Sequence, residues 1–471
     1  MRKEESRILN VLADRYASKA MCRIWSREEK IRRERILWIE VMKAQSRFGL
    51  EISKDQIARY EESVDRIDLT SIDERERELK HDVKARIEEF NALAGLQFIH
   101  LGLTSRDITE NVELVQIRDS LILIRSEVLG VLGLLASQMD QHRNLVMVGR
   151  THNVPAQLIT LGKRFATIAE ELLFALQRLD SLVDRLPLRG FKGPVGTTQD
   201  LFDLVGGQAK ALEAEISESL GFSRILDSTG QIYPRSIDFE VLSTLVQLSS
   251  ALSNLAIMVR LMSGAGLLSE GFADGQVGSS AMPHKVNPRS SERISGLAVV
   301  LKGYLSMISE ISGDSWNEGD VSCSVVRRIA LPDAFLAIDG MFQTAATVLR
   351  EVSVSREAIM EEVEQYLPYI ASTRFLTAAM KAGMDRESAY RKIQGAALLS
   401  LRDREAGREV NFLKLLADDP EFPLDVSQLQ QEISTLQTLP MAERQVETLL
   451  ERIKEVVETQ GASGVNFQEI I

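Results

Sequence analysis

Three long segments without proline constrain the fold of this chain more than any other feature. They are Asn111–Asp140, Ala156–Leu186 and Ile237–Met262, and apolar residues recur in each of them at helical spacing. Helices of about 26–30 residues are roughly 40–45 Å long. Because Ile237–Met262 is apolar on nearly every face, it has to be buried among other helices. The sequence therefore predicts an all-α protein with a large central helical bundle, of a kind that several subunits can share.

The rest of the chain divides around this long-helix region. A chain of 471 residues is too long for one ordinary core, and only 11 prolines interrupt it. Runs of β-branched residues with alternating polarity are scarce, whereas good helix formers dominate. We expect an N-terminal helical domain over residues 1–104, a central bundle domain over residues 105–354 and a C-terminal helical domain over residues 355–471.

Charge and composition exclude several classes of protein. The net charge of −12 disfavours a general nucleic-acid binder, which is usually basic. No uninterrupted apolar run approaches the ~18–20 residues of a membrane span, and the charged N-terminus does not resemble a signal peptide. The two cysteines, Cys22 and Cys323, suit a reducing compartment. We therefore expect a cytoplasmic protein that binds neither nucleic acid nor membrane.

The segment Gly278–Pro288, which reads GSSAMPHKVNP, carries the clearest chemical signal. Small residues expose backbone N–H groups, so such a loop can form a nest for an oxyanion. Lys285 adds a positive charge and Asn287 adds an amide donor. A flexible linker would explain the small residues, but it has no need for Met, Lys, Asn and two prolines in this order. The loop therefore predicts a site for a carboxylate whose negative charge grows during a reaction.

Histidine is rare in this chain, with five residues in all. A histidine taken at random is more often structural than catalytic. His152 stands out, because the segment GRTHNVPAQ around it predicts a position at the start of a helix, where a neutral, titratable ring is favoured. The five histidines show no metal-ligand spacing. We expect neither a metal nor a cofactor.

Several segments together resemble one known family. GSSAMPHKVNP resembles the pattern GSSxMPxKxN of the fumarase/aspartase superfamily, whose members are all-α, complete a central bundle by forming tetramers, and mostly release fumarate. Within it, the chain resembles the adenylosuccinate lyase family, particularly its animal type. The segments that carry this narrower resemblance are Arg15–Ser18 (RYAS), Lys80–Val83 (KHDV), His100–Asn111 (HLGLTSRDITEN) and Gly149–Arg164 (GRTHNVPAQLITLGKR).

The resemblance implies a carbon–nitrogen lyase that converts adenylosuccinate to AMP and SAICAR to AICAR, without a cofactor, in a homotetramer whose active sites are shared between subunits. It implies that Ser279 is the general base and His152 the general acid. The succinyl carboxylates would be held by Thr104, Ser105, Lys285 and Asn287. Other substrate contacts would come from Lys80, His81, Asp82, Gln231 and Arg293, and the ribose and 5′-phosphate would be held by Arg15, Tyr16, Ser324 and Arg328.

One departure from the family pattern leaves the substrate open. The segment Trp316–Arg328 matches the family's phosphate segment, except that Gly319 stands where an Arg normally binds phosphate. A lost contact of that kind costs about 1.5–3 kcal/mol. Either Arg327 or another cation compensates, or the substrate is a different N-succinyl amine without the 5′-phosphate. A non-catalytic structural relative is a third alternative, against which Ser279 and His152 argue.

Overall fold

The structure is a computed structural model that describes residues 9–271, 282, 284–408, 411–460 and 467–468. Its elements are α1 (Val11–Arg15), α2 (Lys19–Ile24), α3 (Arg27–Arg47), α4 (Lys54–Glu61), α5 (Leu69–Leu79), α6 (Asp82–Ala94), α7 (Ser105–Gln141), β1 (Val146–Thr151), β2 (Val154–Thr160), α8 (Leu161–Arg185), α9 (Gln199–Val205), α10 (Ala209–Ser219), α11 (Ser236–Gly264), β3 (Leu268–Ser269), α12 (Arg289–Ile311), α13 (Cys323–Glu351), β4 (Ser353–Val354), α14 (Arg356–Ile370), α15 (Ser372–Lys381), α16 (Arg386–Glu405), α17 (Phe412–Ala417), α18 (Val426–Ser434) and α19 (Pro440–Gln460).

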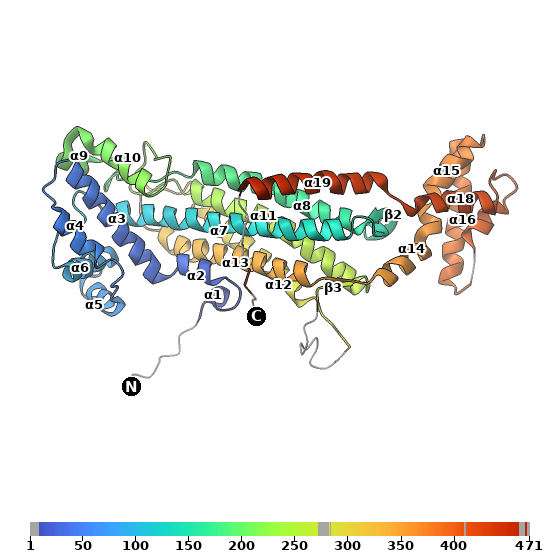
Figure 1. Cartoon of the computed structure of the whole chain (residues 1–471), viewed down its shortest axis with the longest axis horizontal. Helices are drawn as coiled ribbons and strands as arrows, with labels where there is room; N and C mark the ends of the chain where they lie inside the picture. The colour runs from blue at the N-terminus through green and yellow to red at the C-terminus, as the bar shows by residue number, and fades with distance from the viewer. Residues whose placement is uncertain (1–8, 272–281, 283, 409–410, 461–466, 469–471) are drawn as a thin grey trace.

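The expected all-α fold is confirmed, with an elongated bundle of long helices along the middle of the molecule (Figure 1). Helices α7, α11 and α13 run in one direction, because side chains at their N-terminal ends contact one another. Helices α8, α12 and α19 run in the opposite direction. The N-terminal ends of α7 and α13 therefore lie at one end of the bundle, and their C-terminal ends lie together at the other, where Gln138 donates to the carbonyl of Leu349 (2.9 Å).

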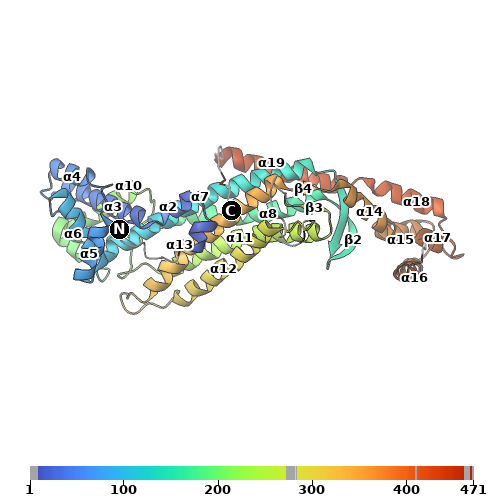
Figure 2. The same ribbon diagram turned by 90° about the horizontal axis from the view of Figure 1, so that it is seen from below.

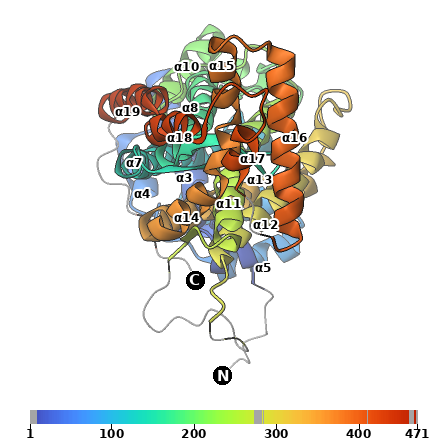
Figure 3. The same cartoon turned by 90° about the vertical axis from the view of Figure 1, so that its right-hand side faces the viewer.

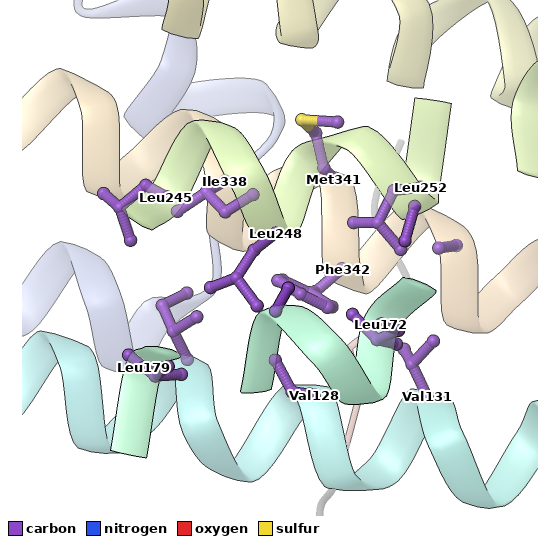
Figure 4. Packing of buried hydrophobic residues seen from close by; sticks show 14 of the residues in the cluster. Val128, Val131, Leu172, Leu179, Leu245, Leu248, Leu252, Ile338, Met341 and Phe342 are labelled. Atoms are coloured by element: carbon purple, nitrogen blue, oxygen red, sulfur yellow. The ribbon is translucent and has the colours of Figure 1, made fainter. Parts of the chain in front are cut away.

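The interior of the bundle is built from aliphatic side chains of four helices that meet along its axis. Their spacing of three and four residues puts them on one face of each helix, and they are almost completely buried. Figure 4 shows them interdigitating between α7, α8, α11 and α13: Val128, Val131, Leu172, Leu179, Leu245, Leu248, Leu252, Ile338, Met341 and Phe342.

Two smaller groups of helices lie at the ends of the bundle. At one end, α3, α4 and α6 surround a second core together with α9 and α10, which come from much later in the chain, and α5 packs on α6 (Figure 1). At the other end, α14 to α18 form a group that faces the viewer in Figure 3. The predicted boundary at residue 104 is the N-cap of α7, and that at 354 lies in β4. Since α19 returns to pack on α7 and α8, the division into domains stays a prediction.

Three bundle helices, α7, α11 and α12, are long and apolar enough to cross a membrane when judged by length and composition alone. Here they pack lengthwise against other helices of the same chain. In the most apolar 18-residue stretch of α12, only 33% of the residues are buried, and Val299 on this helix is 70% exposed. Helix α11 likewise exposes Ile257 and Leu261. A large apolar surface therefore remains on this side of the bundle.

One local prediction is wrong. The segment from Ala156 was expected to be helical, with His152 at the helix N-terminus, but β1 and β2 form an antiparallel hairpin there (Figure 2). His152 and Asn153 occupy its turn with φ of +52° and +60°, as the two central residues of a hairpin turn require. Helix α8 begins only after Thr160, whose hydroxyl accepts from the N–H of Lys163 (3.1 Å). Valine and threonine residues around the turn favour strand over helix.

Candidate active site

A pocket of about 630 Å³ opens where the N-terminal ends of α7 and α13 meet the turn between α5 and α6. Five cationic and three acidic side chains line it, which makes the pocket locally positive in a protein of net charge −12. It brings together eight of the residues implicated by the sequence: Lys80, His81, Asp82, Thr104, Ser105, Gln231, Ser324 and Arg328. These residues are distant in the chain, so only the tertiary fold unites them.

The turn between α5 and α6 presents Lys80 and His81 to this pocket. Lys80 caps α5 with φ of +54°, a conformation that costs an L-residue about 1 kcal/mol or more. His81 caps α6, and its Nδ1 accepts a hydrogen bond from the N–H of Lys84 (3.3 Å). That bond leaves Nε2 directed toward the Oγ of Ser105, 3.5 Å away. The ring therefore connects the turn to the N-terminus of α7.

The N-terminus of α7 is fixed by a buried ion pair. Thr104 and Asp107 form a capping box, in which the Thr104 N–H donates to Asp107 (2.8 Å). Asp107 also accepts from Arg189 (2.6 Å), and neither of these two side chains is exposed. Arg189 in turn donates to the carbonyl of Gly230 (3.0 Å). The sequence TSRD is therefore partly structural, because Asp107 aligns the predicted carboxylate-binding residues instead of facing the pocket.

Gln231 reaches the pocket because two loops pack tightly together. Its N–H donates to the carbonyl of Glu318 (2.6 Å). A Cβ on Gly230 would lie only 2.1 Å from that carbonyl oxygen, so no larger residue fits there. Gly319 lies against the same loop with φ of +132°. The segment around Gly319 thus supports Gln231.

A buried cluster of charges forms the floor of the pocket. Arg327 donates to Asp238 (2.7 Å) and to Glu113 (2.6 Å), and Arg235 donates to Glu110 (2.9 Å). Burial raises the pKa of Glu113, but Arg327 and Lys30 outweigh it and hold the pKa below its usual range. Glu113 therefore stays ionised, and the cluster is an internally paired base for the N-terminal ends of α7, α11 and α13.

Asp82 and Arg328 face each other across the pocket rim, with 3.6 Å between a guanidinium nitrogen and a carboxylate oxygen. Burial raises the pKa of Asp82, but the nearby Arg86 and Arg328 lower it below its ordinary value overall. The Arg328 side chain is largely exposed. It is therefore free to turn toward an anion in the pocket.

A second group of predicted residues lies elsewhere on the bundle. The guanidinium of Arg293 is 5.6 Å from the ring centre of Tyr16, which follows Arg15 at the end of α1. A Cβ on Gly340 of α13 would lie 2.7 Å from the carbonyl oxygen of Tyr16. Since Gly340 follows Ser324 by sixteen positions on α13, this group is about 24 Å along the helix from the pocket.

The end of the segment Gly278–Pro288 leads toward this second group. Lys285 and Asn287 immediately precede α12, whose fifth residue is Arg293. Glu270 fixes the start of α12 by accepting from the N–H of Ser290 (2.7 Å) and from the hydroxyl of Ser291 (2.9 Å). The predicted base Ser279 lies outside the described residues.

His152 lies apart from both groups. The β1–β2 hairpin follows the C-terminus of α7 and packs on α14, at the opposite end of the bundle from the pocket (Figures 1 and 2). Helix α7 has 37 residues, so it separates His152 from Thr104 by about 55 Å. One copy of the chain therefore does not bring His152 to the pocket.

Arg106 lines the pocket but was not predicted from the sequence as a site residue. Arg106 donates to Glu110 one turn along α7 (3.0 Å) and to the Oγ of Ser324 (2.9 Å). An Arg four residues before a Glu on a helix reads as an ordinary surface ion pair. Its contact with Ser324 spans 218 positions and depends on the fold. Within the described ranges, no group of three or more His, Cys, Asp or Glu residues is arranged to hold a metal.

Comparisons with known proteins agree with this architecture. Solved structures of a fumarate lyase from Mesorhizobium sp. BNC1 and a 3-carboxy-cis,cis-muconate lactonizing enzyme from Pseudomonas putida superpose with TM-scores of 0.80 and 0.82. They cover 92% and 95% of this chain, and the chain covers 98% and 99% of theirs. At 20% and 19% identity, they establish the fold alone.

Sequence comparisons identify the family. Residues 11–303 match a family model described as lyase, and residues 368–453 match one described as adenylosuccinate lyase C-terminus. The adenylosuccinate lyases of Saccharomyces cerevisiae and Methanothermobacter thermautotrophicus are 30% and 31% identical, over 94% and 93% of this chain and 93% and 97% of theirs. That of Schistosoma mansoni is 32% identical over 82% of both chains. The fungal, archaeal and animal relatives have similar identities to this chain, 30%, 31% and 32%. The resemblance to the animal type in particular therefore stays a prediction. The chain belongs to the adenylosuccinate lyase family of carbon–nitrogen lyases, within the fumarase/aspartase superfamily.

Proposed function

We propose that this protein eliminates fumarate from adenylosuccinate, giving AMP, and from SAICAR, giving AICAR, in purine nucleotide biosynthesis in the cytoplasm. The observation that carries the proposal is the locally positive pocket, in which eight residues implicated by family resemblance meet although they are spread from position 80 to position 328. The family membership of the chain makes this the reaction expected of such a pocket.

The proposed chemistry is a β-elimination. Ser279 removes a proton from Cβ of the succinyl group, and the electron pair is first held by the adjacent carboxylate. Lys285, Asn287, Thr104 and Ser105 supply positive charge and donors to that carboxylate, which lowers the barrier as its charge increases. The C–N bond then breaks, and its electrons go to nitrogen. His152 gives the nitrogen a proton, so fumarate and the free amine leave.

The remaining residues recognise the purine nucleotide. Lys80, His81 and Asp82 at the turn between α5 and α6, with Gln231 and Arg293, contact the substrate in this proposal. Ser324 and Arg328 on α13, together with Arg15 and Tyr16, hold the ribose and the 5′-phosphate.

Several copies of the chain have to supply one active site. The pocket, the Tyr16 group and His152 are separated within one chain by about 24 and 55 Å along the helices, farther than any side chain reaches. Copies that lie antiparallel along their bundles would bring one copy's hairpin to another copy's pocket. The exposed apolar side chains of α11 and α12 supply the surface for such packing. We therefore propose a homotetramer with active sites shared between subunits.

The test is fumarate release. The purified protein is mixed separately with adenylosuccinate, SAICAR and argininosuccinate, and fumarate is followed by its ultraviolet absorbance. We expect turnover of both purine substrates and none of argininosuccinate. Failure to turn over either purine substrate would remove the proposal.

A second candidate is a lyase for another N-succinyl amine that lacks the 5′-phosphate. Gly319 favours it, because a glycine cannot supply the cation that the family pattern has at this position. A small N-succinyl amine, assayed in the same way, distinguishes the two. Higher kcat/KM for the small amine than for adenylosuccinate would establish this second function.

A further inference from the structure

The backbone at Gly319 is strained for any residue that carries a side chain. Its φ of +132° lies in a region that L-residues rarely adopt. A Cβ at this position would lie 3.1 Å from Cγ1 of Ile232 and 3.4 Å from Cβ of Gln231. The glycine thus belongs to the local packing that supports Gln231. A cation for the anionic end of a substrate has to come from another position.

Arg327 is not that cation, although it lines the floor of the pocket. Its side chain is only 3% exposed. Its guanidinium donates to Asp238, to Glu113 and to the hydroxyl of Tyr233. Turning it toward a ligand would leave these buried carboxylates without their partner, at a large cost.

Arg106 is placed differently. Its side chain is 15% exposed, and it reaches from the first turn of α7 to the first turn of α13. One guanidinium nitrogen donates to Glu110 and the other to the Oγ of Ser324 (2.9 Å). Glu110 is completely buried and forms ion pairs with Arg235 and Arg327, whose guanidinium nitrogens lie 2.9 Å and 3.6 Å from its carboxylate oxygens. The charge of Glu110 is therefore compensated without Arg106.

Three hydrogen-bond donors, Arg106, the Ser324 hydroxyl and Arg328, line one part of the pocket. Arg106 and the Ser324 hydroxyl are in contact, and Arg328 follows Ser324 by one helical turn on the same face of α13. All three line the same pocket. A planar guanidinium can donate to two oxygens of one phosphate, and the hydroxyl can turn its proton toward a third. This set matches a tetrahedral dianion better than a single carboxylate.

We propose that Arg106 is a specificity-determining residue that binds the phosphate of the substrate, together with Ser324 and Arg328, and supplies the cation that Gly319 does not. The inference rests on the proposed function, since it takes the phosphorylated end of a nucleotide to occupy this part of the pocket. It favours the phosphorylated purine substrates over the small amine.

The test compares two substrates that differ only in the phosphate. KM and kcat are measured for adenylosuccinate and for its dephosphorylated nucleoside, with wild-type protein, Arg106→Ala and Arg106→Lys. We expect Arg106→Ala to raise KM for adenylosuccinate roughly ten- to a hundredfold, with kcat nearly unchanged and KM for the nucleoside unaffected. Arg106→Lys should recover part of the loss, because it keeps the charge but not the planar pair of donors.

Arg125→Ala is the matched control, because Arg125 is also on α7 but pairs with Asp180 (2.6 Å) far from the pocket. It should leave both KM values unchanged. Equal rises in KM for the two substrates in Arg106→Ala would indicate a merely structural role and overturn the proposal, as would an unchanged KM for adenylosuccinate. If the wild-type protein turns over neither substrate, the proposed function fails. Arg106 is then tested by titration with inorganic phosphate, and equal binding by wild type and Arg106→Ala would reject its role.

Discussion

Glu127 of α7 and Asp339 of α13 place two carboxyl groups against each other in the interior of the bundle. Asp339 accepts from the backbone N–H of Ser18 and from its hydroxyl (2.8 Å). Glu127 Oε1 accepts from Gln343 (2.7 Å), whereas no donor among the described residues reaches Oε2. A proton on Oε2 would complete the network, because it can be donated to Asp339. Burial, followed by the charge of Asp339, raises the pKa of Glu127 well above its ordinary value.

This network ties the predicted substrate residues Arg15 and Tyr16 to the bundle, since Ser18 lies only two positions after Tyr16. The oxygen of the Gln343 side chain accepts from the N–H of Gln468 (2.7 Å), and the Gln468 side chain accepts from the N–H of Lys19 (3.2 Å). The N-terminal element, α7, α13 and residue 468 are therefore joined in one closed set of hydrogen bonds.

The first prediction concerns stability against pH. Glu127 holds its proton in the folded state to higher pH than in the unfolded state, so its contribution is fully present below the unfolded pKa and is lost as pH rises through the folded pKa. Glu127→Gln keeps a donor toward Asp339 without titrating. We expect the Tm of wild type to fall more steeply than that of Glu127→Gln as pH rises from 5 to 9, by scanning calorimetry.

Other groups near this pair also titrate. Burial and Asp339 raise the pKa of Cys22, and burial raises that of Asp339 itself, so only the difference between wild type and Glu127→Gln reports on Glu127. Glu127→Ala is the control. It should cost about 1–3 kcal/mol for each buried polar group left unpaired. Parallel Tm profiles for wild type and Glu127→Gln would contradict a protonated Glu127.

The second prediction concerns Gly319. Gly319→Arg should lower the free energy of unfolding by about 1–3 kcal/mol, because the backbone conformation is strained for any L-residue. It should not decrease KM for adenylosuccinate, since the new side chain disturbs the loop that supports Gln231. Denaturant unfolding and steady-state kinetics provide the measurements. Gly319→Ala carries the same backbone strain without a charge, so it should have a similar stability and a similar KM for adenylosuccinate. A KM lowered only by Gly319→Arg would contradict the prediction, because it would show that an arginine in this loop can bind the phosphate.

The third prediction concerns the buried pair of Asp107 and Arg189. Arg189→Ala leaves a buried carboxylate without its partner, so it should cost about 3–5 kcal/mol and greatly decrease activity, because Thr104 and Gln231 lose their supports. Thermal unfolding and fumarate release test this. Arg452→Ala removes an exposed pair with Glu170 (2.9 Å) and should change stability by less than about 1 kcal/mol. Equal effects of the two variants would show that the Asp107 pair is not a structural anchor.

The fourth prediction concerns sharing of the active site between copies. His152→Ala and Lys80→Ala alter groups at opposite ends of the bundle, and each alone should decrease activity strongly. When the two variants are unfolded, mixed and refolded together, about a quarter of the sites should receive both unaltered groups by random assortment. Fumarate release measures the recovery. No recovery in a mixture that forms the same oligomer would mean that each copy supplies both groups to one site.

The elements that could be predicted from sequence are those specified by near neighbours. Apolar residues at helical spacing fixed α7 and α11, whose observed bounds extend the predicted stretches by a few residues. The hairpin before α8 was not predicted, although Asn153 between valine-containing segments is a signal for it, because the helical spacing of apolar residues in α8 continues back through residues 156–160. The roles of Ser279 and His152 are still predictions, since family resemblance is their support.

What the sequence determined by itself is the fold class and the family, together with a predicted set of site residues, because side-chain periodicity and short motifs are encoded within a few positions of each other. What only the tertiary structure decided is how those residues are grouped. It joined Lys80 to Ser324, separated both from His152, gave Asp107 a structural role and directed Arg106 toward Ser324. The physical reason is that these relationships depend on how rigid helices pack over tens of ångströms, and no local pattern records which helix ends will meet.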